Sequence, residues 1–316
     1  MGPIGKHLRW LAAALAGLLL TGCALGASEA RQPIIDLHRH APWPGDSDKT
    51  ALSEIRQAMR DYDVVASALF ITDREDLALY PSSNQGRFIL SPMFPCPALT
   101  AERKWCFTET GGPMPDAEWL EHELAAGTLA GLGELVFNYA GIRPDDPAME
   151  AFWSLAARYD APAFVHSGRG PGPGQGPRRY PGCCPDYQAD YGNPDMLRPV
   201  LRKHPQLRIV LGHTGFDYLD ETIALLRDFP NVYAEMSVLN SVGPRELHDA
   251  SLRRLVEAGF ADRIVLGSDD QDYAPIVERI EAADFLTPEQ RRGIYYDNAA
   301  RFLRFDADTI ARDYRR

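Results

Sequence analysis

The sequence predicts a (β/α)8 barrel over residues 33–305. Eight short apolar runs alternate with segments of helical periodicity, and each run is continuously apolar, as in parallel strands that are buried on both faces. Eight such units in one domain fit a barrel, in which the chemistry lies at the carboxyl ends of the strands. An open doubly wound sheet is the alternative fold, but it predicts a glycine-rich phosphate turn after the first strand. This chain instead has DLHRH at residues 36–40.

The expected strands are apolar runs of strand length, and they comprise residues 33–40, 64–72, 86–94, 129–137, 161–167, 207–215, 231–238 and 263–270. The expected helices comprise residues 50–62, 115–127, 144–160, 193–204, 219–229, 244–260, 274–285, 288–305 and, as a C-terminal helical tail, 306–316. In the first helix, Leu52, Ile55 and Met59 recur at helical spacing. In the second, Asp116 indicates the start and Gly127 the stop.

The first 22 residues predict a signal peptide rather than part of the fold. Lys6 and Arg9 precede a short apolar run that ends in LTGC, and this pattern resembles the lipobox of bacterial lipoproteins. The resemblance implies cleavage before Cys23, lipid on that cysteine and a short tether over residues 23–32. An ordinary secretory signal is the alternative. The residue after Cys23 is alanine rather than a retention aspartate, which favours the outer membrane within a bacterial cell envelope.

The charge of the chain is strongly acidic. The 316 residues include 33 basic and 44 acidic side chains, for a net charge of −11. Such a balance argues against nucleic acid as a partner and against electrostatic binding to anionic lipid. A content of 45 % hydrophobic and 24 % charged residues is ordinary for a globular protein with a sizeable core.

Four cysteines remain once Cys23 is assigned to the lipid anchor: Cys96, Cys106, Cys183 and Cys184. Disulfides persist in exported proteins, and four cysteines allow three pairings. A bridge between the adjacent Cys183 and Cys184 would be strained and uncommon. A bridge between Cys96 and Cys106 alone, or two bridges that join the two loops, both stay open. A thiolate metal site is less favoured because the C-x-x-C spacing is absent.

Polar residues of metal-binding type follow apolar runs at five of the predicted strands: His38, His40, Glu134, His166, His213 and Asp269. In a barrel these strand ends converge on one mouth, where four imidazoles and two carboxylates need a compensating partner. A divalent metal provides that partner, and these ligand types suit Zn²⁺, with Mn²⁺ or Fe²⁺ possible. The histidines of three predicted helices, His122, His204 and His248, are expected on the surface instead.

The ordered motifs DLHRH, VHSG, LGHTG and LGSDD, at residues 36–40, 165–168, 211–215 and 266–270, together resemble the amidohydrolase superfamily. The closing NAARFL at residues 298–303 looks like the tail of its amidohydrolase-related branch. The resemblance covers residues 33–305. It implies a metal-dependent enzyme that acts on a small-molecule substrate.

The resemblance also implies a role for each strand-end residue. His38, His40 and Asp269 would hold the more buried metal, and Asp269 would accept the proton of the attacking water. His166 would be a ligand, and His213 either a ligand of a second metal or an acid–base partner. Glu134 would bridge two metals in a binuclear site or act as a structural acid in a mononuclear one, so that one or two ions are expected.

The resulting hypothesis is a metal-dependent hydrolase that cleaves an amide, lactone or other ester bond. A mononuclear decarboxylase or lyase of the same superfamily is the first alternative, and a non-catalytic metal-containing surface binding protein is the second. In the loop after the fifth strand, Arg169, Arg178 and Arg179 could bind an anionic group of the substrate. Asp270 and Asp272 could orient a histidine of the site, although Asp272 is more simply a surface charge.

Overall fold

Eight parallel strands form the centre of the molecule in the computed structural model, which describes residues 32–42, 48–80, 87–97, 106–107, 112–172 and 183–315. The strands are β1 (Ile34–Asp36), β2 (Val64–Ile71), β3 (Phe88–Pro92), β4 (Leu132–Leu135), β5 (Ala163–His166), β6 (Ile209–Gly212), β7 (Val232–Glu235) and β8 (Ile264–Val265). Each lies beside its neighbour in sequence, in sheets of order β1-β2-β3 and β4-β5-β6-β7-β8.

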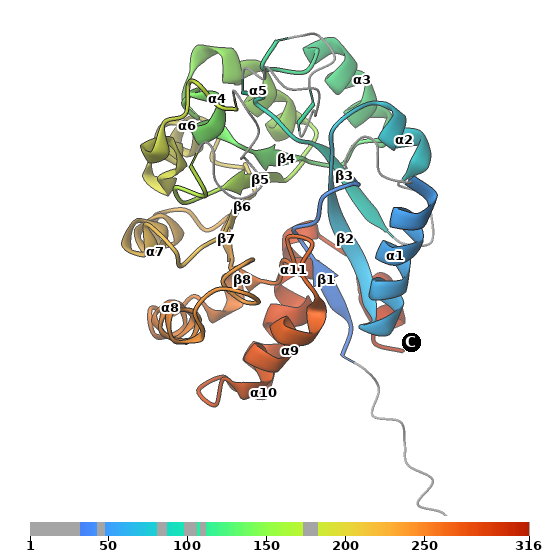
Figure 1. The fold of residues 1–316 in the computed structure, drawn as a ribbon, viewed down its shortest axis with the longest axis vertical. Coiled ribbons are helices and arrows are strands. Elements are labelled where there is room, and N and C mark those ends of the chain that lie inside the picture. Colours follow the sequence, from blue (N-terminus) through green and yellow to red (C-terminus); the bar gives the residue numbers. More distant parts are fainter. Residues whose placement is uncertain are drawn as a thin grey trace, which may run out of the picture.

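Single bridges join the two sheets at both seams. Phe94 pairs with Leu135 between the third and fourth strands, and Asp36 pairs with Leu266 between the first and the eighth. The strands are therefore arranged in sequence around a ring, as Figure 1 shows, with the helices outside it. All residues of all eight strands but one are buried, which explains why the apolar runs do not alternate with polar residues. The predicted (β/α)8 fold class is confirmed.

The helices cover the outside of the strands (Figure 1) and comprise α1 (Asp48–Asp61), α2 (Glu75–Leu79), α3 (Ala117–Ala126), α4 (Phe137–Ala140), α5 (Glu150–Arg158), α6 (Arg198–Lys203), α7 (Leu219–Asp228), α8 (Arg245–Glu257), α9 (Tyr273–Ala282), α10 (Pro288–Arg292), α11 (Asn298–Leu303) and α12 (Ala307–Asp313). Asp116 accepts a hydrogen bond from the Trp119 amide at the start of α3, and Gly127 ends it at φ 72°. None of the described helices has both the length and the apolar character of a membrane span.

Some elements differ from the prediction. The short helices α2 and α4 were not predicted, since neither is long enough to show a helical period. The predicted helix over 288–305 divides into α10, a π-helical turn (Gly293–Asp297) and α11. His248 was predicted on the surface and is buried on the inner side of α8, so that prediction is wrong, whereas His122 is exposed.

Two disulfides form within the loops that the sequence left open. Cys96 is bonded to Cys106, and Cys183 is bonded to its neighbour Cys184. Both pairs lie in buried positions of the core. The two bridges that would join the two loops are therefore not adopted, and the expectation against a bond between the adjacent cysteines is wrong. Residues 1–22, Cys23 and the tether to residue 31 lie outside the described residues, so the predicted anchor stays a prediction.

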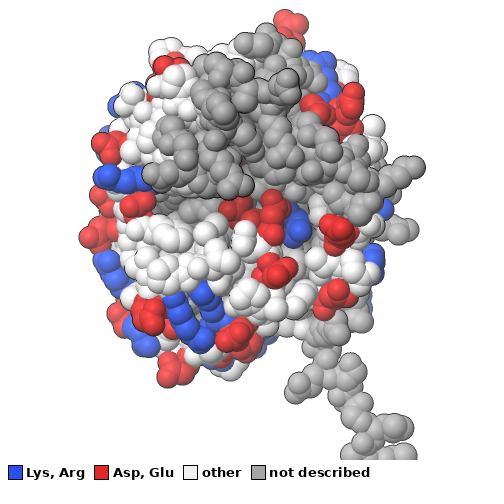
Figure 2. Space-filling model, in the orientation of Figure 1, with Lys and Arg blue, Asp and Glu red and all other residues white. Residues whose placement is uncertain are grey.

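The visible face of the molecule carries acidic and basic side chains close to one another (Figure 2). Exposed ion pairs of the described chain include Arg158 with Glu121 and Arg254 with Asp220. Pairs of this kind contribute little to stability but leave a surface of mixed sign.

Candidate active site

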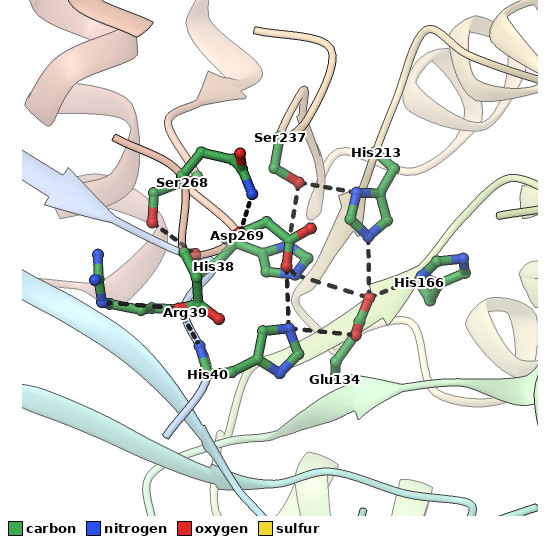
Figure 3. Close-up of polar contacts among 12 residues, drawn as sticks. His38, Arg39, His40, Glu134, His166, His213, Ser237, Ser268 and Asp269 are labelled. Atoms are coloured by element: carbon green, nitrogen blue, oxygen red, sulfur yellow. Dashed lines mark hydrogen bonds and ion pairs between the residues drawn. The ribbon is translucent and has the colours of Figure 1, made fainter. Parts of the chain in front are cut away.

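Five strands and the turns that follow them bring the predicted residues together (Figure 3), and all of them but His38 line one cavity. His38 and His40 follow β1, Glu134 lies in β4, His166 ends β5, His213 follows β6 and Asp269 follows β8. His40 pairs with Phe70 of β2, which extends the first strand past its regular hydrogen bonding. His38 and His40 thus point to the same side of the backbone, as residues two apart in an extended chain do.

Asp269 lies against both histidines of the first strand. Its Oδ1 is 3.1 Å from Nε2 of His40 and 3.4 Å from Nε2 of His38. The Asp269 amide donates to the His38 carbonyl at 2.7 Å, which fixes the turn after β8 to the end of β1. The part of the site formed by His38, His40 and Asp269 therefore depends on the pairing of the last strand with the first, which closes the ring.

Glu134 occupies the centre of the cluster (Figure 3). Its Oε1 is 2.8 Å from Nδ1 of His166, 3.1 Å from Nε2 of His213 and 3.8 Å from Nε2 of His38. Its Oε2 is 3.8 Å from Nε2 of His40. One carboxylate thus reaches all four predicted histidines, from its position in the strand that faces β1 and β8 across the ring.

Left-handed backbone conformations mark the turns that carry the site. His213, Asp269 and Asp270 have φ of 58°, 48° and 60°, although none of them is glycine. Such conformations are uncommon for residues with a Cβ and concentrate where surrounding structure imposes them, often at functional sites. Here they turn the side chains of His213 and Asp269 from the strand direction toward the cavity.

The protonation of the cluster is strongly coupled. Burial alone would lower the pKa of His38, but the charges of Asp269, Glu235 and Glu134 outweigh it and raise that pKa to about 10. Burial would raise the pKa of Glu134, yet the neighbouring histidines, His166 first, hold it well below its usual range. The pKa of Asp269 is also lowered by its histidines, against the effect of burial. The carboxylates are thus negative, and they need positive charge nearby.

A divalent cation fits this arrangement. The metal-ligating atoms of His38, His40 and Asp269 lie within 4.8 Å of one another, as do those of His38, Glu134 and His213. His38 belongs to both groups, and its Nε2 is buried and makes no hydrogen bond within the described residues. This atom is therefore available as a metal ligand. Imidazole nitrogen with carboxylate oxygen is a donor set of the kind that Zn²⁺ takes. His166 belongs to neither group in the described chain. Its Nδ1 lies 2.8 Å from Oε1 of Glu134, the same oxygen that Nε2 of His213 faces, so its role as a ligand stays a prediction.

Behind the ligands lies a buried layer of acidic and hydroxyl side chains that the sequence analysis missed. Glu235, at the end of β7, contacts His38 and Ser237, while Asp36 accepts hydrogen bonds from Ser268 and Tyr273 at 2.7 and 2.6 Å. The sequence signal for Glu235 is its position at the end of the apolar run VYAE, as His166 ends the run AFVH.

A cavity of about 550 Å³ opens above the cluster. Met93, Pro171, Phe216 and Val238 form apolar walls, and the site residues form the floor. This size suits a small organic molecule. The polar groups of the mouth include Asp217, Asp270 and Gln271.

Of the three arginines singled out for the substrate, only Arg169 lies among the described residues. The guanidinium of Arg169 is exposed, 3.6 Å from the Asp190 carboxylate, and does not line the cavity in the described part of the chain. Arg178 and Arg179 lie outside the described residues. Asp270 accepts a hydrogen bond from the His40 amide at 3.1 Å, as expected for a residue that supports the site.

The amidohydrolase family model matches residues 36–305, and the chain belongs to that family. The family consists of enzymes and is usually metal-dependent, so this chain is an enzyme whose His, Glu and Asp cluster is a metal-site candidate. No curated protein matches.

Solved structures show the same fold at low identity. A TIM-barrel protein from Bordetella bronchiseptica is 17 % identical with a TM-score of 0.59, covering 90 % of this chain and all of its own. A 2,6-dihydroxybenzoate decarboxylase from Rhizobium is 17 % identical with a TM-score of 0.57, covering 87 % and 100 %. A probable 2-pyrone-4,6-dicarboxylic acid hydrolase from Acinetobacter baumannii is 14 % identical with a TM-score of 0.55, covering 86 % and 99 %.

Proposed function

We propose that this enzyme is a metal-dependent hydrolase that cleaves a lactone, another ester or an amide bond of a small molecule. The observation that supports it best is the position of Glu134, whose carboxylate stands between the group of His38, His40 and Asp269 and the imidazole of His213. Two ligand groups that share His38 fit a site for one or two cations. Zn²⁺ is the cation that the ligands favour, with Mn²⁺ or Fe²⁺ as alternatives.

His38, His40 and Asp269 would hold one cation, and Glu134 with His166 and His213 would complete the site. When bound, a divalent cation would polarise the scissile carbonyl and lower the pKa of a nearby water. The neighbouring histidines lower the pKa of Asp269 against the effect of burial and keep its carboxylate ionised. This carboxylate would accept the proton of the attacking water and pass it to the leaving group. The apolar walls from Met93 and Val238 would exclude bulk water from the substrate.

A decarboxylase is the second candidate function. The group of His38, His40 and Asp269 forms a site for one cation without Glu134. His213 would then serve as an acid–base residue held by Ser237 and Glu134. Structural neighbours with decarboxylase and hydrolase in their names have similar TM-scores, so the fold supports both reactions.

Elemental analysis of the purified enzyme, with an activity screen, tests the proposal. Two cations per chain and turnover of lactones, esters or N-acyl compounds are the expected results. One cation per chain, with release of CO2 from aromatic acids and no hydrolysis, would assign the decarboxylase reaction instead. A chain that captures small molecules without turning any over would support the binding-protein alternative.

We also propose that the enzyme is anchored by lipid at Cys23 in a bacterial cell envelope. The support is the basic, apolar and small-residue pattern of residues 1–22. Cys23→Ser is expected to move the protein from the membrane fraction to the soluble fraction after expression in a bacterium that processes lipoproteins. Retention of the variant in the membrane fraction would contradict the anchor.

A further inference from the structure

We propose that Glu235 and Ser237 are positioning residues that hold the imidazoles of His38 and His213 with their Nδ1 atoms protonated and their Nε2 lone pairs toward the metal site. The inference rests on the proposed function only in requiring that a cation is bound, whichever reaction follows. It concerns two side chains that lie behind the cavity floor and contact two candidate ligands on different strands.

Glu235 is completely buried and accepts every hydrogen bond that it makes. Its Oε2 lies 2.9 Å from Nδ1 of His38 and 2.9 Å from Oγ of Ser237, while its Oε1 accepts from the Ser237 amide. A carboxylate has no proton to donate. Nδ1 of His38 must therefore carry the proton, which leaves Nε2 as the coordinating atom.

Ser237 imposes the same protonation, a proton on Nδ1, on the imidazole of His213. Its hydroxyl has a single proton, which goes to Oε2 of Glu235. The Oγ atom, 2.9 Å from Nδ1 of His213, can then only accept a hydrogen bond from that nitrogen. One buried acid thus sets the tautomer of two imidazoles, directly for His38 and through the serine for His213.

Two motif glycines make room for this arrangement. A Cβ at Gly267 would lie 2.6 Å from Cγ of Glu235, closer than carbon atoms approach. A Cβ at Gly212 would lie 3.3 Å from the His38 ring and 3.5 Å from Oε2 of Glu235. The space that the Glu235–His38 pair occupies therefore explains why glycine stands directly before His213 and directly before Ser268.

Hydrogen bonds of this kind orient metal-bound histidines and raise their basicity, and their loss typically reduces metal affinity by about 10- to 100-fold. Glu235→Gln keeps the shape, but either orientation of the amide sets an N–H group against another donor. Ser237→Ala removes only the link to His213. Ser241→Ala is the matched control, since within the described chain this buried serine hydroxyl contacts only the Val238 carbonyl.

The test is a zinc titration of the wild type and the three variants against a chromophoric chelator. We expect a Zn²⁺ affinity loss of about 10- to 100-fold for Glu235→Gln, a smaller loss for Ser237→Ala and an unchanged affinity for Ser241→Ala. Equal affinity in Glu235→Gln, Ser237→Ala and wild type would contradict the inference. If Glu235→Gln does not fold, Ser237→Ala against Ser241→Ala decides.

A spectroscopic reading separates positioning from general destabilisation. In the zinc-loaded protein labelled with ¹⁵N-histidine, the wild type should show slowly exchanging Nδ1–H protons for His38 and His213. Ser237→Ala should lose the signal of His213 and keep that of His38. A proton on Nε2 of either ring would overturn the assignment. Zinc binding without hydrolysis by the wild type would contradict the proposed function and leave this inference standing.

Discussion

Two buried polar clusters of the barrel differ in how their charges are balanced. Near the amino end of β3, the Arg87 guanidinium binds the buried Asp313 carboxylate with two hydrogen bonds, one of 2.6 Å, and Tyr296 donates to the same carboxylate at 2.7 Å. At the carboxyl ends of the strands, Glu134 and Asp269 face only histidines at ion-pair distance among the described residues.

The difference separates a structural cluster from a functional one. A permanent cation completes the cluster of Arg87 and Asp313, and no further partner is needed. The imidazoles of the other cluster can balance Glu134 and Asp269 only when they bind protons or share a metal. The second cluster is therefore the one whose state depends on pH and on a dissolved cation.

The largest effect is expected from Asp269→Asn, which removes both a ligand and the proton acceptor. Turnover of the best hydrolytic substrate should fall by at least about 10²- to 10⁴-fold, measured as kcat at saturating zinc. Asp272→Asn is the matched control, because Asp272 is exposed three residues further on, before α9. Equal losses in the two variants would argue against a catalytic role for Asp269.

The cluster of Arg87 and Asp313 can be disrupted without changing a residue of the candidate metal site. Arg87→Met leaves the buried Asp313 carboxylate without its cation, which should reduce the free energy of unfolding by about 3–5 kcal/mol. Zinc affinity should stay at the wild-type value, because the cluster shares no residue with the site. Denaturant unfolding and the zinc titration measure the two quantities. A parallel loss of zinc affinity would show that the two clusters are not independent.

The metal-free enzyme should lose stability as the pH rises from about 6.5 toward 10. His38 has a pKa of about 10 when folded and near 6.5 when unfolded, so its contribution is fully present below pH 6.5 and is lost as the folded pKa is passed. With zinc bound, the cation replaces the proton and this decline should disappear. Thermal unfolding across this pH range, with and without zinc, measures the difference. Identical profiles would contradict the exchange of protons for metal.

The smallest effect is expected from Arg169→Ala. Its guanidinium pairs with Asp190 on the surface, and such exposed pairs contribute little to stability. Neither the free energy of unfolding nor KM should change measurably. A large rise in KM would instead restore the sequence-based hypothesis that this arginine binds the substrate.

The strand-end pattern made most of the site predictable. His38, His213 and Asp269 each follow an apolar run, and parallel strands in a ring must bring such ends together. The run VYAE ending in Glu235 carries the same signal, but no second ligand type beside it distinguishes it from an ordinary strand. Its role depends on a contact 197 residues away in the sequence, with His38, which no local pattern contains.

Other features depended on packing that the sequence does not display. His248 has charged neighbours in the chain, yet it faces the barrel because Leu252 and Leu255 share its side of α8. His166 was expected among the ligands, and this stays a prediction; its Nδ1, 2.8 Å from Glu134 Oε1, is the nitrogen that faces the cluster. Which nitrogen of an imidazole faces a partner is a matter of ring orientation, and residue type alone does not determine it.

The central claim is that His38, His40 and Asp269 hold a divalent cation. Crystals of enzyme purified without chelator, measured at wavelengths on both sides of the zinc absorption edge, test it most directly. The account predicts an anomalous peak, present only above the edge, within coordination distance of the Nε2 atom of His38 and the carboxylate of Asp269. A zinc-replete crystal with no peak at these residues, or with a peak only elsewhere, would contradict it.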